Sequence, residues 1–293
     1  MDKILVIVVT YNAIKWIDKC LRSITQSSIP LDTFIVDNKS SDETCNYIIK
    51  KFPNMKLVEN KVNFGFGRAN NIGLKYAIDK NYNYVYLLNQ DAWIDTNTIE
   101  TLIRIHKAHT EYGTISPIQI NAAHNKLDAN FEKCCMPLHC PSLINDMLIN
   151  QLKDIYDVDA TMAAHWLISR KCLLKVGLFS PSFPHYGEDN NYQQRVSFFK
   201  LKNGICPLVY GVHDRENRLA NNKKKIYLNY INIITALSNI QLPLHKSLKQ
   251  ALYLSFILSC DILKMKTLEP MLYIAKLILT FPYILRNRKG AIF

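Results

Sequence analysis

The sequence of 293 residues lacks the short motifs that identify several common kinds of site. Its eight cysteines include no CxxC pair and have no regular spacing, so neither a zinc site nor a disulfide framework is expected, and reduced thiols are the better interpretation. Gly65 and Gly67 have no third glycine and do not follow the first predicted strand, and no GK[ST] sequence occurs. A Rossmann dinucleotide site and a P-loop are therefore not supported.

Long apolar runs and targeting segments are also missing. The run from Ile4 to Val9 is too brief and wrongly flanked for a signal peptide. The apolar stretches Leu252 to Leu263 and Met271 to Leu285 are each shorter than the roughly 20 residues needed to span a bilayer. No internal repeat or low-complexity segment occurs. We therefore expect a protein that faces the cytosol.

Negative charge is scarce relative to positive charge. The chain has 36 Lys and Arg against 24 Asp and Glu, a net charge of +12, and the excess concentrates after residue 220. This surplus predicts an anionic partner, namely a nucleotide, nucleic acid or anionic lipid. No basic and aromatic recognition motif supports nucleic acid. The basic clusters are Lys223-Lys224-Lys225, Lys246 with Lys249, Lys264 with Lys266, and Arg286-Asn287-Arg288-Lys289.

Unbroken apolar runs predict a parallel sheet. The runs Ile4–Val9 and 84–88 are apolar without alternation, as expected of strands buried on both faces, and further strands are expected at 33–36 and 55–58. Segments with helical spacing separate them, so the pattern indicates βαβ units with right-handed crossovers. The first half is predicted to be a nucleotide-binding α/β domain, and a later strand is expected at residues 205–212.

Polar side chains stand where three of these strands end. Ligands of open α/β sheets bind at the carboxyl ends of the strands. A carboxylate such as Asp91 suits a hard divalent cation held against a diphosphate, and Asp37 suits a hydrogen bond from a ribose or a base N–H. A role in a turn or helix cap is the alternative for each, but the coincidence of three ends favours a site. The three ends are Thr10-Tyr11-Asn12, Asp37-Asn38 and Asn89-Gln90-Asp91.

Two later segments add candidate side chains. Glu188 and Asp189 begin a helix predicted to run to about Lys200. Because adjacent residues project about 100° apart, only one of the pair can face a ligand squarely; simple complementation of the helix dipole is the alternative. His213 ends the last strand and becomes a candidate metal ligand only if that strand lies near Asp91.

Residues 121 to 157 carry no specific signal. Pro137, Pro141, three cysteines and His139 suggest an irregular insertion, followed by a weak helix around residues 148–155. Such a segment fits the wall of an acceptor pocket as well as a surface excursion.

Taken in order, these segments resemble the family 2 glycosyltransferases with the GT-A fold, over about residues 3 to 215. The order of six motifs carries the likeness, since each motif alone is weak. The arrangement is most similar to the bacterial rhamnosyltransferase-like branch that builds surface glycans. The motifs are Val8-Val9-Thr10-Tyr11-Asn12, Val36-Asp37-Asn38-x-Ser40-x-Asp42, Asn63-x-Gly65-Phe66-x-x-x-Asn70-x-x-Gly73, Leu87-Leu88-Asn89-Gln90-Asp91, Val176-Gly177-Leu178-Phe179, and Tyr186-Gly187-Glu188-Asp189 with Arg195.

The resemblance implies a role for each matching position. Asp189 matches the catalytic base, and Glu188 is the neighbour that helps to shape the site. Asp91 and His213 match the ligands of a Mg2+ or Mn2+ ion; Asn89 replaces the first aspartate of the DxD motif, so tight metal binding without nucleotide is not expected. Arg195 would assist at the diphosphate or pair with Glu188. The positions implied to bind the nucleotide-sugar are Thr10, Tyr11, Asn12, Asp37, Asn38, Gly65, Asn70, Asn89, Gln90 and Asp91.

The activity implied is that of an inverting hexosyltransferase. It would move a sugar from a nucleotide-diphospho-sugar, dTDP-rhamnose or a UDP-sugar, to a glycan or polyprenyl-diphosphate-linked acceptor in surface polysaccharide biosynthesis. One alternative is a sugar-nucleotide nucleotidyltransferase, although the Gly-rich, Arg/Lys-containing loop of that class is missing after the first strand. Another is a non-catalytic membrane- or anion-binding module, which leaves the polar strand ends unexplained.

We expect two regions, a GT-A catalytic domain at residues 1–215 and a basic, amphipathic helical region at residues 216–293. The apolar stretches of the second region, flanked by Lys and Arg, fit helices lying in an anionic membrane surface. Packing on the catalytic domain or on a second subunit of a homo-oligomer is the alternative. The expected location is the cytoplasm, on the cytoplasmic face of the inner membrane.

Overall fold

One mixed sheet forms the body of this computed structural model, which describes residues 2–215, 221–265 and 267–288. In that part of the chain the sheet has nine strands, in the order β3-β2-β1-β4-β8-β6-β9-β5, with β7 paired to β9. The strands are β1 (Ile4–Thr10), β2 (Asp32–Asp37), β3 (Lys56–Glu59), β4 (Tyr84–Asn89), β5 (Ala92–Ile94), β6 (Tyr112–Ile120), β7 (Tyr156–Asp157), β8 (His165–Ser169) and β9 (Lys202–His213). The helices are α1 (Ile17–Thr25), α2 (Thr44–Lys51), α3 (Phe66–Asp79), α4 (Thr98–Ala108), α5 (Phe131–Cys135), α6 (Leu143–Leu148), α7 (Arg170–Val176), α8 (Glu188–Phe198), α9 (Asn222–Ser238), α10 (Leu244–Met265) and α11 (Glu269–Arg286).

The first half of the sheet is parallel, as the sequence predicts. β1 pairs in parallel with β2 and β4, and β2 pairs in parallel with β3. In this register Thr10 lies opposite Asp37, and Val9 lies opposite Asn89. The polar ends of the three strands therefore meet at one edge of the sheet.

The second half of the sheet contains antiparallel pairs that the sequence did not reveal. β8 runs antiparallel between β4 and β6, and β5 runs antiparallel to β9. Ala92 lies opposite His213, and the Asp214 N–H donates to the Asp91 carbonyl at 2.8 Å. His213 therefore lies beside Asp91, which meets the condition for treating it as a candidate metal ligand.

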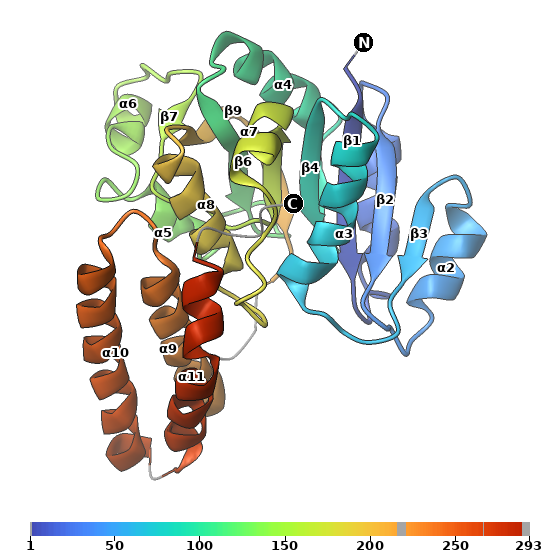
Figure 1. Cartoon of the computed structure of the whole chain (residues 1–293). Coiled ribbons are helices and arrows are strands. Elements are labelled where there is room, and N and C mark those ends of the chain that lie inside the picture. The colour runs from blue at the N-terminus through green and yellow to red at the C-terminus, as the bar shows by residue number, and fades with distance from the viewer. Residues whose placement is uncertain (1, 216–220, 266, 289–293) are drawn as a thin grey trace.

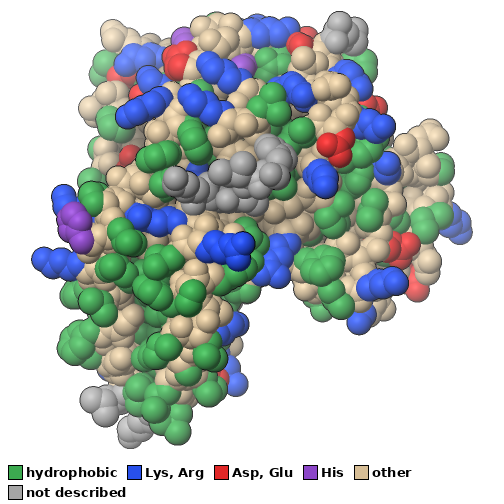
Figure 2. Space-filling model, in the orientation of Figure 1, with side chains coloured by type: hydrophobic (Ala, Val, Ile, Leu, Met, Phe, Trp, Pro, Cys, Tyr) green, Lys and Arg blue, Asp and Glu red, His purple; other side chains and the backbone are tan. Residues whose placement is uncertain are grey.

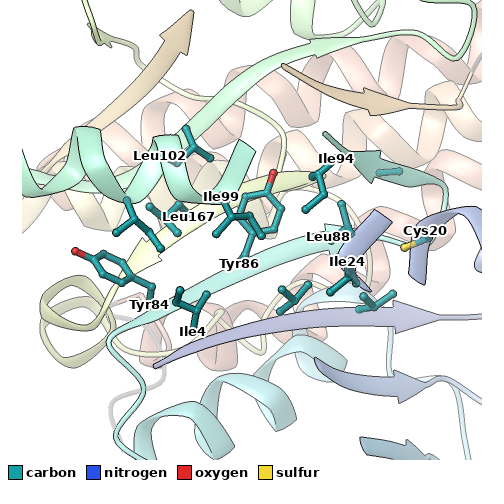
Figure 3. Close-up of a cluster of buried hydrophobic side chains, with 14 of the residues drawn as sticks. Ile4, Cys20, Ile24, Tyr84, Tyr86, Leu88, Ile94, Ile99, Leu102 and Leu167 are labelled. Carbon is teal, nitrogen blue, oxygen red and sulfur yellow. The ribbon is translucent and has the colours of Figure 1, made fainter. Parts of the chain in front are cut away.

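Helices cover both faces of the sheet (Figure 1). α1 and α4 enclose one hydrophobic cluster, and α3, α7 and α8 enclose the other. In Figure 3, Tyr86 and Leu88 of β4 extend into the first cluster near Ile24 of α1 and Ile99 of α4. Residues of β4 with the opposite parity, such as Val85, belong to the second cluster. Burial on both faces explains why the run in β4 does not alternate.

Three local expectations differ from the structure. The helix predicted to be capped by Ser40 or Ser41 begins only at Thr44, because the Ser40 backbone N–H binds Asp37 within the preceding turn. The weak helix expected around 148–155 is replaced by α6, which ends at Leu148 before the short strand β7. α10 and α11 also extend beyond the apolar stretches that predicted them.

The last three helices form a layer below the sheet body (Figure 1). α9, α10 and α11 share a hydrophobic cluster that includes Phe183 of the loop before α8. Asn191 Nδ2 of α8 donates to the Ser238 carbonyl at 3.3 Å, which joins α8 to the end of α9. No helix in the described part of the chain is sufficiently long and apolar to span a membrane. The boundary expected at 215/216 falls beside residues 216–220, outside the described residues, and stays a prediction.

Candidate functional site

Two adjoining cavities lie at the edge where β1, β4 and β9 end. The first, of about 630 Å³, is here called the strand-end cavity. The second, of about 290 Å³, is the helix-side cavity between α8, α9 and the end of β9. Phe66, Asn89 and His185 line both cavities. Of the predicted site residues, the strand-end cavity is lined by Thr10, Tyr11, Asn38, Gly65, Asn89, Gln90 and Asp91, and the helix-side cavity by Asn89, Glu188, Asp189 and His213.

A hydrogen-bonded turn network of Thr10, Asn12, Asp37 and Ser40 joins the ends of β1 and β2. The buried Asp37 carboxylate accepts from Thr10 Oγ1 and from the Ser40 backbone N–H, each at 2.7 Å. The Asn12 backbone N–H donates to Ser40 Oγ at 2.8 Å. Of these four residues, only Thr10 lines the strand-end cavity. The arrangement favours the turn-forming alternative for Asp37 over a direct contact with a nucleoside.

Asn38 and Gly65 shape the wall of the strand-end cavity. Asn38 Nδ2 donates to the Gly65 carbonyl at 3.1 Å. Gly65 has a φ of 79°, and a Cβ there would lie 2.1 Å from the Pro184 carbonyl oxygen, so only glycine fits. Asn70 is buried in the first turns of α3, where Nδ2 donates to the Phe66 carbonyl at 3.0 Å. Its side chain thus stabilises the start of α3.

Tyr11 and Gln90 form a reciprocal pair across the ends of β1 and β4. The Tyr11 N–H donates to Gln90 Oε1 at 2.6 Å, and Gln90 Nε2 donates to the Tyr11 carbonyl at 3.2 Å. The tyrosine is 48% exposed and lines the cavity. An exposed aromatic ring beside a polar cavity presents a flat face on which a nucleobase can stack.

His213 lies between two buried carboxylates. His213 Nε2 is 3.5 Å from Asp91 Oδ1, and His213 Nδ1 is 3.3 Å from Asp128 Oδ2. Burial opposes a charge on the ring, but the two carboxylates outweigh it and raise the pKa of His213. Asp128 is held in turn by the backbone N–H groups of Asn130 and Phe131, which donate to Oδ1 at 2.9 and 3.0 Å.

The residues beside Asp91 fit a divalent cation in part. Carboxylate oxygen and imidazole nitrogen are ordinary ligands of such ions, and Asp91 and His213 supply one of each. Asn89 Oδ1 is buried without a hydrogen-bond partner, and Asn89 Nδ2 is 3.5 Å from His213 Nε2. Among the described residues no group of three or more His, Cys, Asp and Glu could hold a metal ion. A complete coordination shell would therefore require further oxygen ligands, such as those of a bound phosphate.

Glu188 and Asp189 occupy different environments in the first turn of α8. Glu188 is 3% exposed, and its Oε2 has no hydrogen-bond partner. Burial, with the adjacent charge of Asp189, raises the pKa of Glu188 to about 8. Asp189 is only partly exposed, burial raises its pKa, and its Oδ1 accepts from the Asn190 N–H at 2.8 Å. A carboxylate with a raised pKa is a stronger base, so the pair is suited to proton transfer as well as to complementing the helix dipole.

Arg195 has neither of the roles expected for it. Its guanidinium is completely buried and donates to the carbonyls of Val176 at 2.8 Å and Leu178 at 2.7 Å. Seven residues along α8 separate Arg195 from Glu188, or about 10 Å along the helix axis. Arg195 therefore fixes the end of α7 and lines neither cavity.

Several residues around the site were not found from sequence. Asp128 and Arg215 flank His213 from the weakly patterned 121–157 segment and from the end of β9. α9 also supplies a wall of the helix-side cavity, although the sequence assigned the C-terminal region no part in the site. No local pattern marks these side chains, because apolar residues of α9 read as ordinary core. The α9 residues lining the cavity are Leu228, Ile231, Asn232 and Thr235.

Comparison with known families decides the class. The family model described as Glycosyl transferase family 2 matches residues 5–173, more than half of the chain. The chain belongs to glycosyl transferase family 2. A glycosyltransferase named GlyA from Streptococcus pneumoniae serotype 4 is 34% identical over 106 residues. That match covers 35% of this chain but 15% of GlyA, so the chain spans only a small part of that relative's length.

Solved structures confirm the GT-A fold of this family 2 glycosyltransferase. Mannosyltransferase PcManGT from Pyrobaculum calidifontis, in complex with GDP-Man and Mn2+, has a TM-score of 0.62 at 17% identity and covers 98% of this chain and 84% of its own. S. aureus TarS 1-349 in complex with UDP-GlcNAc has a TM-score of 0.57 at 17% identity, covering 85% and 70%. A longer TarS chain is matched over 41% of its length. Identities this low show the fold alone.

Proposed function

We propose that this enzyme transfers a sugar with inversion from a nucleotide-diphospho-sugar to an acceptor hydroxyl, as a hexosyltransferase. The observation that carries the proposal is that the two cavities meet at Asn89. The polar strand ends line one of them, and a carboxylate with a raised pKa lines the other. A donor in the strand-end cavity and an acceptor in the helix-side cavity would then meet beside Asp189.

Asp189 is the proposed base. It takes the proton of the acceptor hydroxyl as that oxygen attacks the anomeric carbon. The new bond forms on the face of the anomeric carbon opposite the diphosphate. The bond to the diphosphate breaks, and the nucleoside diphosphate leaves with the electron pair of that bond. Glu188, with a pKa of about 8, carries a proton at neutral pH, so it adds no second negative charge beside Asp189. Its unpartnered Oε2 then supplies a hydrogen-bonding group toward the bound sugars.

Asp91 and His213 are the proposed holders of Mg2+ or Mn2+. PcManGT and GalNAc-T7 have been solved with Mn2+, GalNAc-T7 at a TM-score of 0.59 and 15% identity. A bound ion of this kind neutralises charge on the leaving diphosphate as a Lewis acid. In this chain Asp128 Oδ2 lies 3.3 Å from His213 Nδ1 as an ion-pair contact without hydrogen-bond geometry, and its charge would favour the ring orientation in which Nε2 faces Asp91. Asp128 thus acts through His213 as a positioning residue.

The nucleotide is proposed to lie against Tyr11, Asn38 and Gln90 in the strand-end cavity. Thr10, Asn12, Asp37, Gly65 and Asn70 support that wall from behind or beside it. TarS has been solved with UDP and with UDP-GlcNAc, and PcManGT with GDP-Man. These complexes support a nucleotide-sugar donor, for which we propose dTDP-rhamnose or a UDP-sugar, as in the rhamnosyltransferase-like branch.

The acceptor is proposed to be a glycan or a polyprenyl-diphosphate-linked glycan in bacterial surface polysaccharide biosynthesis, met at the cytoplasmic face of the inner membrane. The apolar Leu228 and Ile231 in the wall of the helix-side cavity support an acceptor with an apolar part. The catalytic part is proposed to comprise residues 1–215, with α9 of the 216–293 region completing the acceptor side.

Thermal unfolding with UDP, dTDP, GDP and CDP, each with and without Mn2+, tests the proposal. One nucleotide should raise the Tm, and more so with Mn2+, since a ligand of the native state stabilises it by RT ln(1 + [L]/Kd). Asp91→Asn should remove the Mn2+-dependent part of that rise. Asp95→Asn, which changes a carboxylate outside both cavities, should not. A folded sample that responds to no nucleotide contradicts the proposal, and sugar transfer undiminished by excess EDTA contradicts the metal role.

A further inference from the structure

The outer surfaces of α10 and α11 expose large apolar side chains. Leu252 and Phe256 of α10 are 72% and 68% exposed, and Leu272, Ile278 and Leu279 of α11 are 71%, 69% and 83% exposed. Figure 2 shows hydrophobic side chains gathered over this part of the molecule. Exposed apolar surface of this extent is rare unless something covers it. Here the surface is named the outer face, made of Leu252, Tyr253 and Phe256 of α10 with Met271, Leu272, Ile278, Leu279 and Tyr283 of α11.

Helical spacing gathers these residues on one side of each helix. On α11 the exposed Met271, Ile278 and Leu279 recur at intervals of seven and eight residues, which returns them to one side. Leu277 and Ile284 of the same helix are buried in the cluster shared with α9 and α10. α11 is therefore apolar both toward the protein and away from it. The outward apolar side is not needed for packing within the described part of the chain.

Positive charge accompanies the outer face. Residues 221–288 contain ten Lys and Arg against two acidic residues, a net +8 of the chain's +12. Asp261 is buried and accepts from Asn229 Nδ2 at 2.7 Å, and Glu269 lies 3.4 Å from Lys223 Nζ. Neither acidic residue therefore offsets the outward lysines and arginine. Those exposed on α10 and α11 are Lys246, Lys249, Lys264, Lys276 and Arg286; Lys266 and Lys289, of the same basic set, lie outside the described residues.

We propose that the outer face lies in the surface of an anionic lipid bilayer. Apolar side chains would enter the boundary between headgroups and acyl chains, while Lys249, Lys264, Lys276 and Arg286 would meet lipid phosphates. A second copy of the chain is the poorer occupant, since a two-fold interface would bring two surfaces with the same positive charge together. An anionic bilayer attracts the same positive charges and covers the same apolar area.

Docking in this orientation would bring the site to a lipid-linked acceptor; this part of the inference rests on the acceptor proposed above. α9 contributes Leu228 and Ile231 to the helix-side cavity and shares its hydrophobic cluster with α10 and α11. The cavity wall is thus separated from the outer face by a layer of helices, each about 10 Å across. That separation would hold the site close above the bilayer, within reach of a headgroup-linked glycan.

Sedimentation of the full chain with vesicles tests the proposal, because it requires neither donor nor acceptor. The chain should bind vesicles of phosphatidylglycerol and phosphatidylcholine, and bind phosphatidylcholine alone much more weakly. Leu272→Glu with Leu279→Glu should lower binding to the anionic vesicles about 100-fold. Lys276→Gln should lower it about fivefold. The matched control is Leu138→Glu with Leu148→Glu, at leucines 81% and 77% exposed outside the C-terminal helices, which should bind as the original chain does.

Three results would overturn the proposal. The first is equal loss of vesicle binding in the test and control pairs, and the second is vesicle binding that neither pair changes. The third is a dimer, seen by analytical ultracentrifugation without lipid, that Leu272→Glu with Leu279→Glu dissociates; a second copy would then cover the outer face. The response of the Tm to nucleotide with Mn2+, measured on the same variants, reports the donor site separately. A failure of membrane docking therefore leaves the transferase proposal standing.

Discussion

Two polar clusters at the same sheet edge are made from similar residues but differ in how their hydrogen bonds are satisfied. In the turn network, Asp37 accepts hydrogen bonds from Thr10 and Ser40 within the protein. In the cavity group, formed by Asn89, Asp91, His213, Glu188 and Asp189, two buried oxygens have no partner: Asn89 Oδ1 and Glu188 Oε2. A buried unsatisfied polar group costs about 1–3 kcal/mol. The first cluster therefore stabilises the fold, and the second retains capacity for a ligand at a cost in stability.

The largest expected effect is on catalysis by the cavity group. Asp189→Asn keeps the shape of the side chain but removes the proposed base, so kcat for sugar transfer should fall by about 10²–10⁴-fold. The Tm and its rise with nucleotide should stay close to the values for the original chain. Full transfer activity in Asp189→Asn, measured by release of the nucleoside diphosphate with acceptor present, would show that the base is elsewhere.

The pH dependence of the unfolding free energy should show how much the buried Glu188 of the cavity group costs in stability. Its pKa is raised from 4.5 to about 8, with Asp189 and Tyr227 as charged or titratable neighbours. The native state thus binds this proton more tightly than the unfolded state, and its contribution to stability is full below about pH 4.5 and lost as the pH rises through 8. Relative to Glu188→Gln, the original chain should lose on the order of a few kcal/mol of unfolding free energy between pH 5 and pH 9.

Urea unfolding at pH 5, 7 and 9 measures this difference. Glu132→Gln, at an exposed glutamate of α5, is the matched control and should show no such trend. Parallel pH profiles for Glu188→Gln and the original chain would mean that Glu188 is not held neutral by its surroundings.

A change in the turn network should lower the stability of the fold and leave nucleotide binding nearly unchanged. Asp37→Asn places an amide NH2 among the donors of Thr10 and Ser40, so it should lower the unfolding free energy by about 2–3 kcal/mol. Nucleotide Kd in the folded variant should change less than about threefold. If stability holds while nucleotide affinity collapses, Asp37 contacts the nucleoside directly, and the two clusters do not divide as described.

The difference between the turn network and the cavity group explains how much of the site can be predicted from the sequence. Unbroken apolar runs identify β1 and β4, because burial on both faces leaves no alternation, and the strand ends then locate the site edge. Polar residues such as Asp37 and Asp91 look alike in sequence, however, and only their partners separate a turn network from a ligand site. Arg195 was misassigned for the same reason, since its carbonyl partners depend on where α7 ends.

Asp128 is the residue that the sequence had least means to reveal. It reaches His213 across 85 positions, from a segment without periodic pattern, and only the pairing of β6 with β9 brings the two together. On its proposed role of positioning His213, Asp128→Asn should weaken the Mn2+-dependent part of nucleotide binding about 10–100-fold. Nucleotide binding without metal should persist, since Tyr11 and Asn38 are unchanged.

Mn2+ titration followed by electron paramagnetic resonance, in the presence of the stabilising nucleotide, measures that affinity without turnover. The chain offers a matched control in His139 and Asp159, an exposed pair with Nδ1 3.2 Å from Oδ2. Asp159→Asn changes the same type of contact in solvent and should leave Mn2+ affinity unaltered. If both variants bind Mn2+ like the original chain, the burial of Asp128 serves folding alone, and the cavity group ends at His213. If only Asp128→Asn binds Mn2+ more weakly, the metal site includes the support of Asp128, from the 121–157 segment that carried no sequence signal.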